Sequence, residues 1–155
     1  MKSKPEQAAD LAAIRAVALD LLARREHSQQ ELARKLQTRG FEVDASADAL
    51  KLLVSDGLLS DERFTETFVY SRFRRGSGPQ KIRAELRERG IDDALIEHTI
   101  EALDEDWQAR LREVREKKFG AGLPGDFRER SRQMRFLQQR GFSAEQIARV
   151  LRDDE

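Results

Sequence analysis

The sequence contains no cysteine among its 155 residues. This absence excludes disulfide bonds, thiolate metal sites and catalytic cysteines, and it fits a reducing compartment. No stretch approaches the roughly 20 apolar residues that a membrane-spanning helix requires. The first residues, Met1 to Gln7, are polar, and no apolar run of the kind found in signal peptides follows them. The sequence therefore predicts neither a signal peptide nor a membrane-spanning helix.

Proline and glycine are also scarce, with three and nine residues respectively. No segment alternates apolar and polar residues as a β-strand does, whereas apolar residues recur at helical spacing throughout the chain. The pattern predicts nine helices and no strands. These helices are expected at about residues 10–26, 28–40, 45–55, 61–75, 79–89, 93–103, 105–119 and 126–140, with the last one starting at residue 143.

Two of the predicted helices begin with a capping box, in which a serine hydroxyl and a side chain three residues later satisfy free backbone N–H groups. These pairs are Ser28 with Glu31 and Ser143 with Gln146. Aromatic residues make up only 6% of the chain, and they fall mostly at apolar helix positions. We expect Trp107 and Tyr70 to be core or boundary anchors, and Phe127 to face inward with Met134 and Leu137.

A six-residue pattern, L-x-x-R-G-[F/I], occurs three times at nearly equal spacing. The copies are Leu36–Phe41, Leu86–Ile91 and Leu137–Phe142. Each glycine is expected to end a helix in the left-handed conformation, with the arginine before it in an architectural role. The repeat predicts an all-α fold of three tandem three-helix repeats that form an elongated, curved helical solenoid. We place an N-terminal tail at residues 1–9 and the repeats at 10–57, 58–103 and 104–155.

Charge is balanced overall but unevenly distributed. The chain has 29 Lys and Arg against 29 Asp and Glu. The segment from Arg72 to Ile91 has seven basic residues against two glutamates, with a Gly-Ser-Gly-Pro hinge between its helical halves. The next segment, Asp92 to Asp106, has seven acidic residues and no Lys or Arg. Blocks of charge can steer a charged partner, although an ordinary solvated surface with weak ion pairs remains the alternative.

Several arginines are candidates for electrostatic contacts. On the helix at 79–89, Arg83 and Arg87 should share an exposed flank, while Lys81 should pair with Glu85 on the other flank. In the helix at 126–140, Arg128, Arg132 and Arg135 should form an unpaired basic stripe. Such stripes suit phosphates or acidic protein surfaces, and a solvated face is the alternative for each. The candidate contact residues are Arg72, Arg74, Arg75, Arg83, Arg87, Arg128, Arg132 and Arg135.

Catalytic chemistry finds little support in the sequence. The only histidines, His27 and His98, are far apart, and His98 is expected at the surface or its boundary. There is no zinc-protease motif, phosphate-binding glycine loop or nucleophile motif. We therefore expect no enzymatic activity, no cofactor and no metal site.

Four segments together resemble the RecX-type regulatory proteins, which modulate the RecA recombinase. The segments are Ala18–Leu36 (ALDLLARREHSQQELARKL), Gly57–Phe64 (GLLSDERF), Gly76–Ile91 (GSGPQKIRAELRERGI) and Phe136–Ser143 (FLQQRGFS). The resemblance extends from about Leu11 to Leu151, and its one mild departure is His27, where the family usually has an aromatic residue.

The resemblance implies a cytoplasmic, all-helical protein of three three-helix repeats that has no enzymatic activity. It implies binding in the helical groove of the RecA–DNA filament, where such proteins limit filament growth, ATP hydrolysis, strand exchange and coprotease activity. Weak contact with single- or double-stranded DNA is possible. The alternative is a helical-repeat nucleic-acid-binding protein that acts without RecA. A monomer is expected, because the repeats can bury one another's apolar faces.

Overall fold

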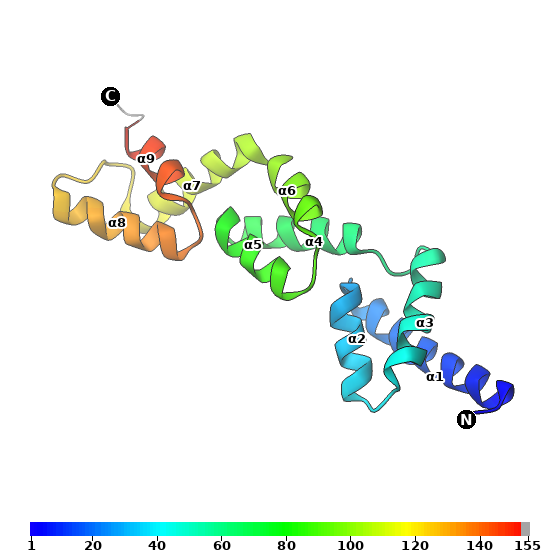
Figure 1. Ribbon diagram of the computed structural model, residues 1–155. Coiled ribbons are helices and arrows are strands. Elements are labelled where there is room, and N and C mark those ends of the chain that lie inside the picture. The colour runs from blue at the N-terminus through cyan, green and yellow to red at the C-terminus, as the bar shows by residue number, and fades with distance from the viewer. Residues whose placement is uncertain (153–155) are drawn as a thin grey trace. The chain divides into compact units, whose positions relative to one another are not determined.

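The structure, a computed structural model, describes residues 1–152, and of Glu105 it describes the backbone alone. This part of the chain forms nine α-helices and contains no strand (Figure 1). The helices are α1 (Lys4–Arg24), α2 (Gln29–Thr38), α3 (Val43–Ser55), α4 (Asp61–Arg74), α5 (Pro79–Glu88), α6 (Asp93–Glu101), α7 (Asp104–Phe119), α8 (Phe127–Gln139) and α9 (Ala144–Arg152).

The first helix begins earlier than the sequence pattern indicated. Residues 4–9, which we expected in an N-terminal tail, belong to α1. The side chain of Ser3 accepts a hydrogen bond from the backbone N–H of Glu6 and caps the helix. Pro5 lies in the first turn, where its missing N–H has no intrahelical partner to lose. The local capping signal therefore outweighs the absence of an apolar stripe before Asp10.

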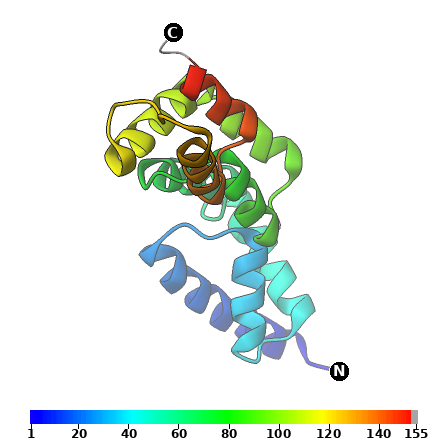
Figure 2. The ribbon, with the colours of Figure 1, turned by 90° about the vertical axis from the view of Figure 1, so that its left-hand side faces the viewer.

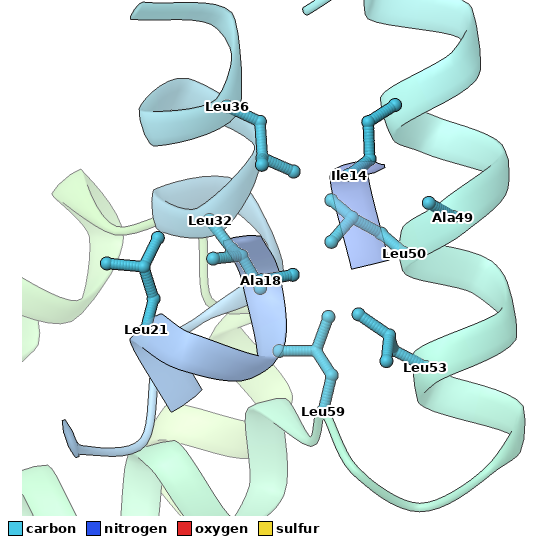
Figure 3. Close-up of a cluster of buried hydrophobic side chains, with 9 residues drawn as sticks. All are labelled: Ile14, Ala18, Leu21, Leu32, Leu36, Ala49, Leu50, Leu53 and Leu59. Atoms are coloured by element: carbon cyan, nitrogen blue, oxygen red, sulfur yellow. The ribbon is translucent and has the colours of Figure 1, made fainter. Parts of the chain in front are cut away.

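The chain divides into two compact units, which we describe separately. The first contains residues 1–67 and 89–91, and the second contains residues 68–88 and those from 92 onward. The core of the first unit is drawn in Figure 3 and consists of side chains from α1, α2, α3 and the segment after α3. These residues are Ile14, Ala18, Leu21, Leu32, Leu36, Ala49, Leu50, Leu53 and Leu59. Val54 of α3 lies outside this core and is 39% exposed.

An aromatic row forms part of the second unit. The Trp107 ring is buried, its Nε1–H donates to the carbonyl of Ile100 at 2.9 Å, and Phe73 meets it edge-on at 5.1 Å. Trp107 is thus a core anchor, as predicted. Tyr70 stacks on Phe73 at 6.4 Å but is 55% exposed, so the row reaches the surface there.

The prediction for Phe127 is wrong, because this residue is 83% exposed. The buried side of α8 is centred on Gln133 and Leu137. At roughly 100° per residue, Phe127 lies about 80° from Leu137 and about 120° from Gln133 around the helix. As the first helical residue it has no preceding turn to pack on, and its side chain points outward.

The three L-x-x-R-G-[F/I] turns have the predicted backbone. Gly40, Gly90 and Gly141 have φ values of 90°, 78° and 103°, in the left-handed region that favours glycine. The apolar residue after each glycine packs fully or partly in the interior. Ile91 and Phe142 are buried, and Phe41 packs partly buried against the core of the first unit. The shared pattern is therefore a structural helix stop.

Two of these turns accept a hydrogen bond from the residue that precedes the middle helix of another repeat. In the first unit, the Ser28 hydroxyl donates to the carbonyl of Arg89 at 2.8 Å. In the second, the N–H of Gly78, the residue at the matching repeat position, donates to the carbonyl of Arg140 at 2.7 Å. A Cβ at Gly78 would lie 2.3 Å from the carbonyl carbon of Gly141, so only glycine permits this approach.

His27, next to the cap of α2, is buried in the first unit. Its Nδ1 lies 3.0 Å from the carbonyl of Arg25 and its Nε2 lies 2.8 Å from the ammonium of Lys35. These partners favour a neutral ring that donates through Nδ1 and accepts at Nε2. Burial is the main cause that lowers the pKa of His27. The residue at the family's usual aromatic position is thus a packed, neutral ring.

Candidate interaction surface

All eight arginines predicted as contact residues lie in the second unit. Three come from the last turn of α4 and the turn that follows it, two from α5 and three from α8. The structure separates these arginines into two groups. Some are held by carboxylates of the same unit, and others make no ion pair within residues 1–152.

Arg83 belongs to the held group. Its Nε lies 2.6 Å from Oε1 of Glu97 and its Nη2 lies 3.1 Å from Oε2, which is a two-pronged contact with α6. Its Nη1 also donates to the side chain of Gln80 at 3.0 Å. The side chain is only 21% exposed. The prediction that Arg83 lies on an exposed flank of α5 is therefore wrong, because Glu97 of α6 binds its guanidinium.

Arg87 and Arg72 are held in the same manner. Arg87 contacts Asp93 at 3.0 Å, with 58% and 73% of the two side chains exposed. Arg72 contacts Glu85 at 3.1 Å in a less exposed pair, and its guanidinium lies 4.5 Å from the centre of the Phe68 ring. The predicted pairing of Lys81 with Glu85 is wrong, because Glu85 accepts from Arg72 instead.

These pairs explain the two charge blocks that adjoin in the sequence. Part of the basic block lies on α5 and part of the acidic block lies on α6, and the two helices pack together. Asp93 and Glu97 supply carboxylates to Arg87 and Arg83. The acidic segment thus meets a basic surface of its own chain. The side chain of Glu105, which belongs to that segment, lies outside the described residues.

Arg74 and Arg75 remain exposed at the end of α4. Arg74 lies 5.7 Å from the centre of the Tyr70 ring, and neither arginine makes an ion pair in the described part of the chain. A side chain from α7 holds the backbone at this helix end. Arg110 donates to the carbonyls of Phe73 and Arg74 at 3.1 and 2.7 Å.

A second arginine completes the cap of α4. Arg140 donates to the carbonyl of Arg75 at 3.0 Å, which agrees with its predicted architectural role. Together the two guanidinium groups bind the last three carbonyls before Gly76, where a cation also favours the helix dipole. Arg110 was missed by the sequence reasoning, because nothing in its local pattern distinguishes it from a solvated arginine of α7.

The stripe on α8 is only partly unpaired. Arg132 contacts Glu129 at 2.9 and 3.0 Å, and its guanidinium lies 5.0 Å from the Phe119 ring centre. The hydrogen bond from Arg132 lowers the pKa of Glu129. Arg128 and Arg135 are exposed, and within residues 1–152 they make no ion pair or hydrogen bond through their side chains. The predicted lack of an ion pair is thus found for Arg128 and Arg135 but not for Arg132.

Two lysines at the end of α7 add further exposed cations to this unit. Phe119 and Phe136 meet edge-on at 5.3 Å, and the ammonium of Lys118 lies 5.4 Å from the Phe136 ring centre. Lys117 is exposed at the end of α7. We call Lys117, Lys118, Arg128 and Arg135 the α7–α8 basic surface. A surface of this kind attracts anionic groups, whether carboxylates or phosphates.

The described residues show neither a metal site nor a membrane span. Outside residues 153–155 and the Glu105 side chain, no three His, Asp or Glu side chains are grouped so that they could hold a metal ion. His27 is buried in the first unit, and His98 is exposed as predicted. None of the described helices combines the length and apolar character needed to cross a membrane.

Comparison with known proteins identifies the family. Models of the first, second and third three-helix domains of RecX match residues 15–53, 60–100 and 104–151. The chain is 50% identical to the regulatory protein RecX of Halorhodospira halophila over 87% of this chain and 84% of that one. It is 48% identical to the RecX of Pseudomonas syringae pv. tomato over 90% of each chain.

Solved structures agree on the fold. The crystal structure of RecX from Lactobacillus salivarius superposes with a TM-score of 0.82, covering 94% of this chain and 97% of that chain at 21% identity. The all-α fold of three three-helix repeats predicted from the sequence is therefore confirmed. With the sequence matches, these findings show that the chain belongs to the RecX family of regulatory proteins.

Proposed function

We propose that this protein binds the filament that RecA recombinase forms on DNA and restrains it, without catalytic activity of its own. The RecX family supports a regulatory role. In our proposal the protein lies in the helical groove of the filament. There it limits filament growth, ATP hydrolysis, strand exchange and coprotease activity during recombination and the SOS response. It acts as a cytoplasmic monomer and needs no cofactor.

The observation that carries this proposal is the set of exposed arginines that have no ion pair in the described chain. Arg74, Arg75, Arg128 and Arg135 can contact carboxylates or phosphates without giving up an existing partner. Arg72, Arg83, Arg87 and Arg132 would first have to leave Glu85, Glu97, Asp93 and Glu129. We therefore rank the unpaired arginines as the principal contacts and the paired ones as secondary.

The ATPase activity of preformed RecA filaments tests this function. The filaments are titrated with the protein, and binding of the protein to single-stranded DNA alone is measured at two salt concentrations. We expect suppression of the ATPase at well below one copy per RecA protomer, with weak binding to DNA alone. A contact with several protomers at once would explain such an effect through avidity.

A nucleic-acid-binding protein that acts without RecA is the second candidate. The α7–α8 basic surface favours it, because four cations there have no carboxylate partner within the described residues. This function predicts tight binding to DNA alone. The affinity should fall steeply as the salt concentration rises, because the release of counterions from DNA then contributes less free energy to binding. Tight, salt-sensitive DNA binding without suppression of the ATPase would replace the first proposal with this one.

A further inference from the structure

A buried arginine holds the loop between α7 and α8. Arg115 is 2% exposed, and no carboxylate contacts its guanidinium in the described part of the chain. It donates instead to the carbonyls of Gly122 and Ala121 at 3.1 and 3.3 Å, and it lies 3.5 Å from Oε1 of Gln133. Burial of a charged group is costly unless hydrogen bonds compensate. These bonds offset part of that cost and tie the loop to α7, whereas Nε of Arg115 is buried without a partner among the described residues.

The start of α8 is fixed as well. The side chain of Asp126 accepts from the N–H of Glu129 at 2.8 Å and caps the helix. Glu129 in turn accepts from Arg132, and from Gln133 at 3.3 Å. A chain of contacts thus runs from the buried Arg115 through Gln133 to the first turn of α8. Figures 1 and 2 show this loop as the non-helical segment that connects α7 to α8.

This fixed segment presents apolar side chains to solvent. Leu123 is 38% exposed and Phe127 is 83% exposed. Single exposed apolar residues are common on protein surfaces. Here two of them lie within four positions of each other on a loop and helix start that buried polar contacts hold. A segment whose backbone is already held loses less conformational entropy on binding than a free loop does, which favours its apolar side chains as interface anchors.

The charge around these side chains indicates what they bind. Arg128 follows Phe127 directly, and Lys117 lies at the other end of the loop. Both are exposed and unpaired within residues 1–152. We propose that Leu123 and Phe127 anchor the protein in an apolar socket rimmed by carboxylates on a protein partner. Carboxylates at the rim would meet Arg128 and Lys117, whereas the centre of the contact would be apolar.

A protein socket fits these residues better than a nucleic acid does. Bases stack on the flat faces of aromatic rings, and Leu123 offers no such face. An aliphatic and an aromatic side chain four positions apart match a pocket in a folded surface instead. This inference rests on the proposed function, because it takes the RecA filament as the partner that carries the socket.

The test compares two double variants that each remove two exposed apolar side chains. In Leu123→Ser/Phe127→Ser the anchor is lost. In Val43→Ser/Leu52→Ser, which is the matched control on α3, the residues replaced are 60% and 54% exposed and lie in the first unit. Val43 is the first residue of its helix, as Phe127 is. Thermal unfolding followed by circular dichroism verifies that both variants fold like the native chain.

The readout is the dissociation constant for RecA filaments assembled on single-stranded DNA, measured by anisotropy of the labelled protein. We expect the anchor variant to bind at least about tenfold more weakly, as for loss of a hot-spot side chain, and the control to bind within about twofold of the native chain. Equal affinities for the two folded variants would overturn the anchor while leaving the proposed function intact.

Two other results would also overturn the anchor. If the native chain does not bind the filaments, the proposed function fails and the anchor fails with it. If the anchor variant loses affinity for single-stranded DNA in the absence of RecA by the same factor, the side chains contact nucleic acid and the protein socket is wrong. These three results can be told apart. In the first the two variants bind filaments equally, in the second the native chain does not bind filaments, and in the third the anchor variant also loses affinity for DNA alone.

Discussion

The arginines of α5 and those of α8 look alike in the sequence but differ in the structure. On α5, Arg83 and Arg87 are held by Glu97 and Asp93 of the neighbouring α6. On α8, Arg128 and Arg135 are exposed and make no ion pair in residues 1–152. A basic run is therefore not by itself an interaction surface. An arginine without a carboxylate in its own chain can form a new ion pair with a partner. An arginine that is already paired must first break an existing contact.

The largest expected effect of this difference is on the suppression of the RecA filament ATPase that we propose for this protein. The substitutions Arg128→Glu and Arg135→Glu in one chain replace two free cations with anions. We expect at least about tenfold more protein to be needed for half-suppression of the filament ATPase, because two close charge pairs are lost. The melting temperature should stay near the native value, since neither side chain is paired.

A control variant makes this prediction specific to α8. Lys4→Glu with Lys51→Glu changes the net charge equally, but both residues lie in the first unit. It should suppress the ATPase at close to the native concentration. Equal weakening by the two variants would show that total charge, and not the α8 surface, controls the interaction.

Reversal of the charge of Arg83 should mainly affect stability. Arg83→Glu places a second carboxylate beside Glu97, so the free energy of unfolding should fall by about 1–2 kcal/mol. Adding Glu97→Arg rebuilds the pair in the opposite direction and should recover most of the loss. Urea unfolding of both single variants and the double variant measures the coupling. Additive effects of the two substitutions would indicate that this pair contributes nothing.

Arg87 allows a finer comparison within α5. Its pair with Asp93 is much more exposed than that of Arg83 with Glu97. Exposed pairs contribute little because water screens them. Arg87→Gln should therefore lower the free energy of unfolding by about 0.5 kcal/mol or less, and by less than Arg83→Gln does. The same urea experiment tests the order, and a larger effect at Arg87 would contradict it.

The smallest expected effect is a change in the pKa of Glu129, which should respond to substitution of Arg132 but not of Arg128. The hydrogen bond from Arg132 depresses the pKa of Glu129 below the ordinary 4.5. A carboxyl whose pKa is lower when folded stabilises the fold above its unfolded-state pKa, and this contribution is lost as pH falls through the folded-state pKa. Nuclear magnetic resonance titration should show the pKa of Glu129 rising in Arg132→Gln. In Arg128→Gln it should stay where it is.

Local features of the fold were predictable from the sequence. The capping boxes at Ser28 and Ser143 are present, with hydrogen bonds in both directions at each. The glycines of the repeated turns have the expected positive φ. These features depend on residues within one or two helical turns, so neighbouring residues suffice to determine them. Repetition of the same pattern then indicated three three-helix repeats.

The interaction surface was predictable only in part. The arginines of α5 were expected to be free, because Glu97 is too distant in sequence from Arg83 for a helical-spacing rule to pair them. Phe127 was expected inside, since an apolar residue at a helix start gives no sign of which side is covered. Arg115 and Arg110 gave no signal at all. Each of these outcomes depends on which helix packs beside the residue.

The sequence by itself therefore determined the all-helical class, the capping boxes at Ser28 and Ser143, the repeated turns and the family. Periodicity and short-range hydrogen bonding are local, and they survive in any arrangement of the helices. Only the tertiary structure decided which charges are neutralised and which are left for a partner. Ion pairing and burial depend on contacts between helices, and α6 happens to bring its carboxylates to α5, whereas Arg128 and Arg135 of α8 receive none from the described chain.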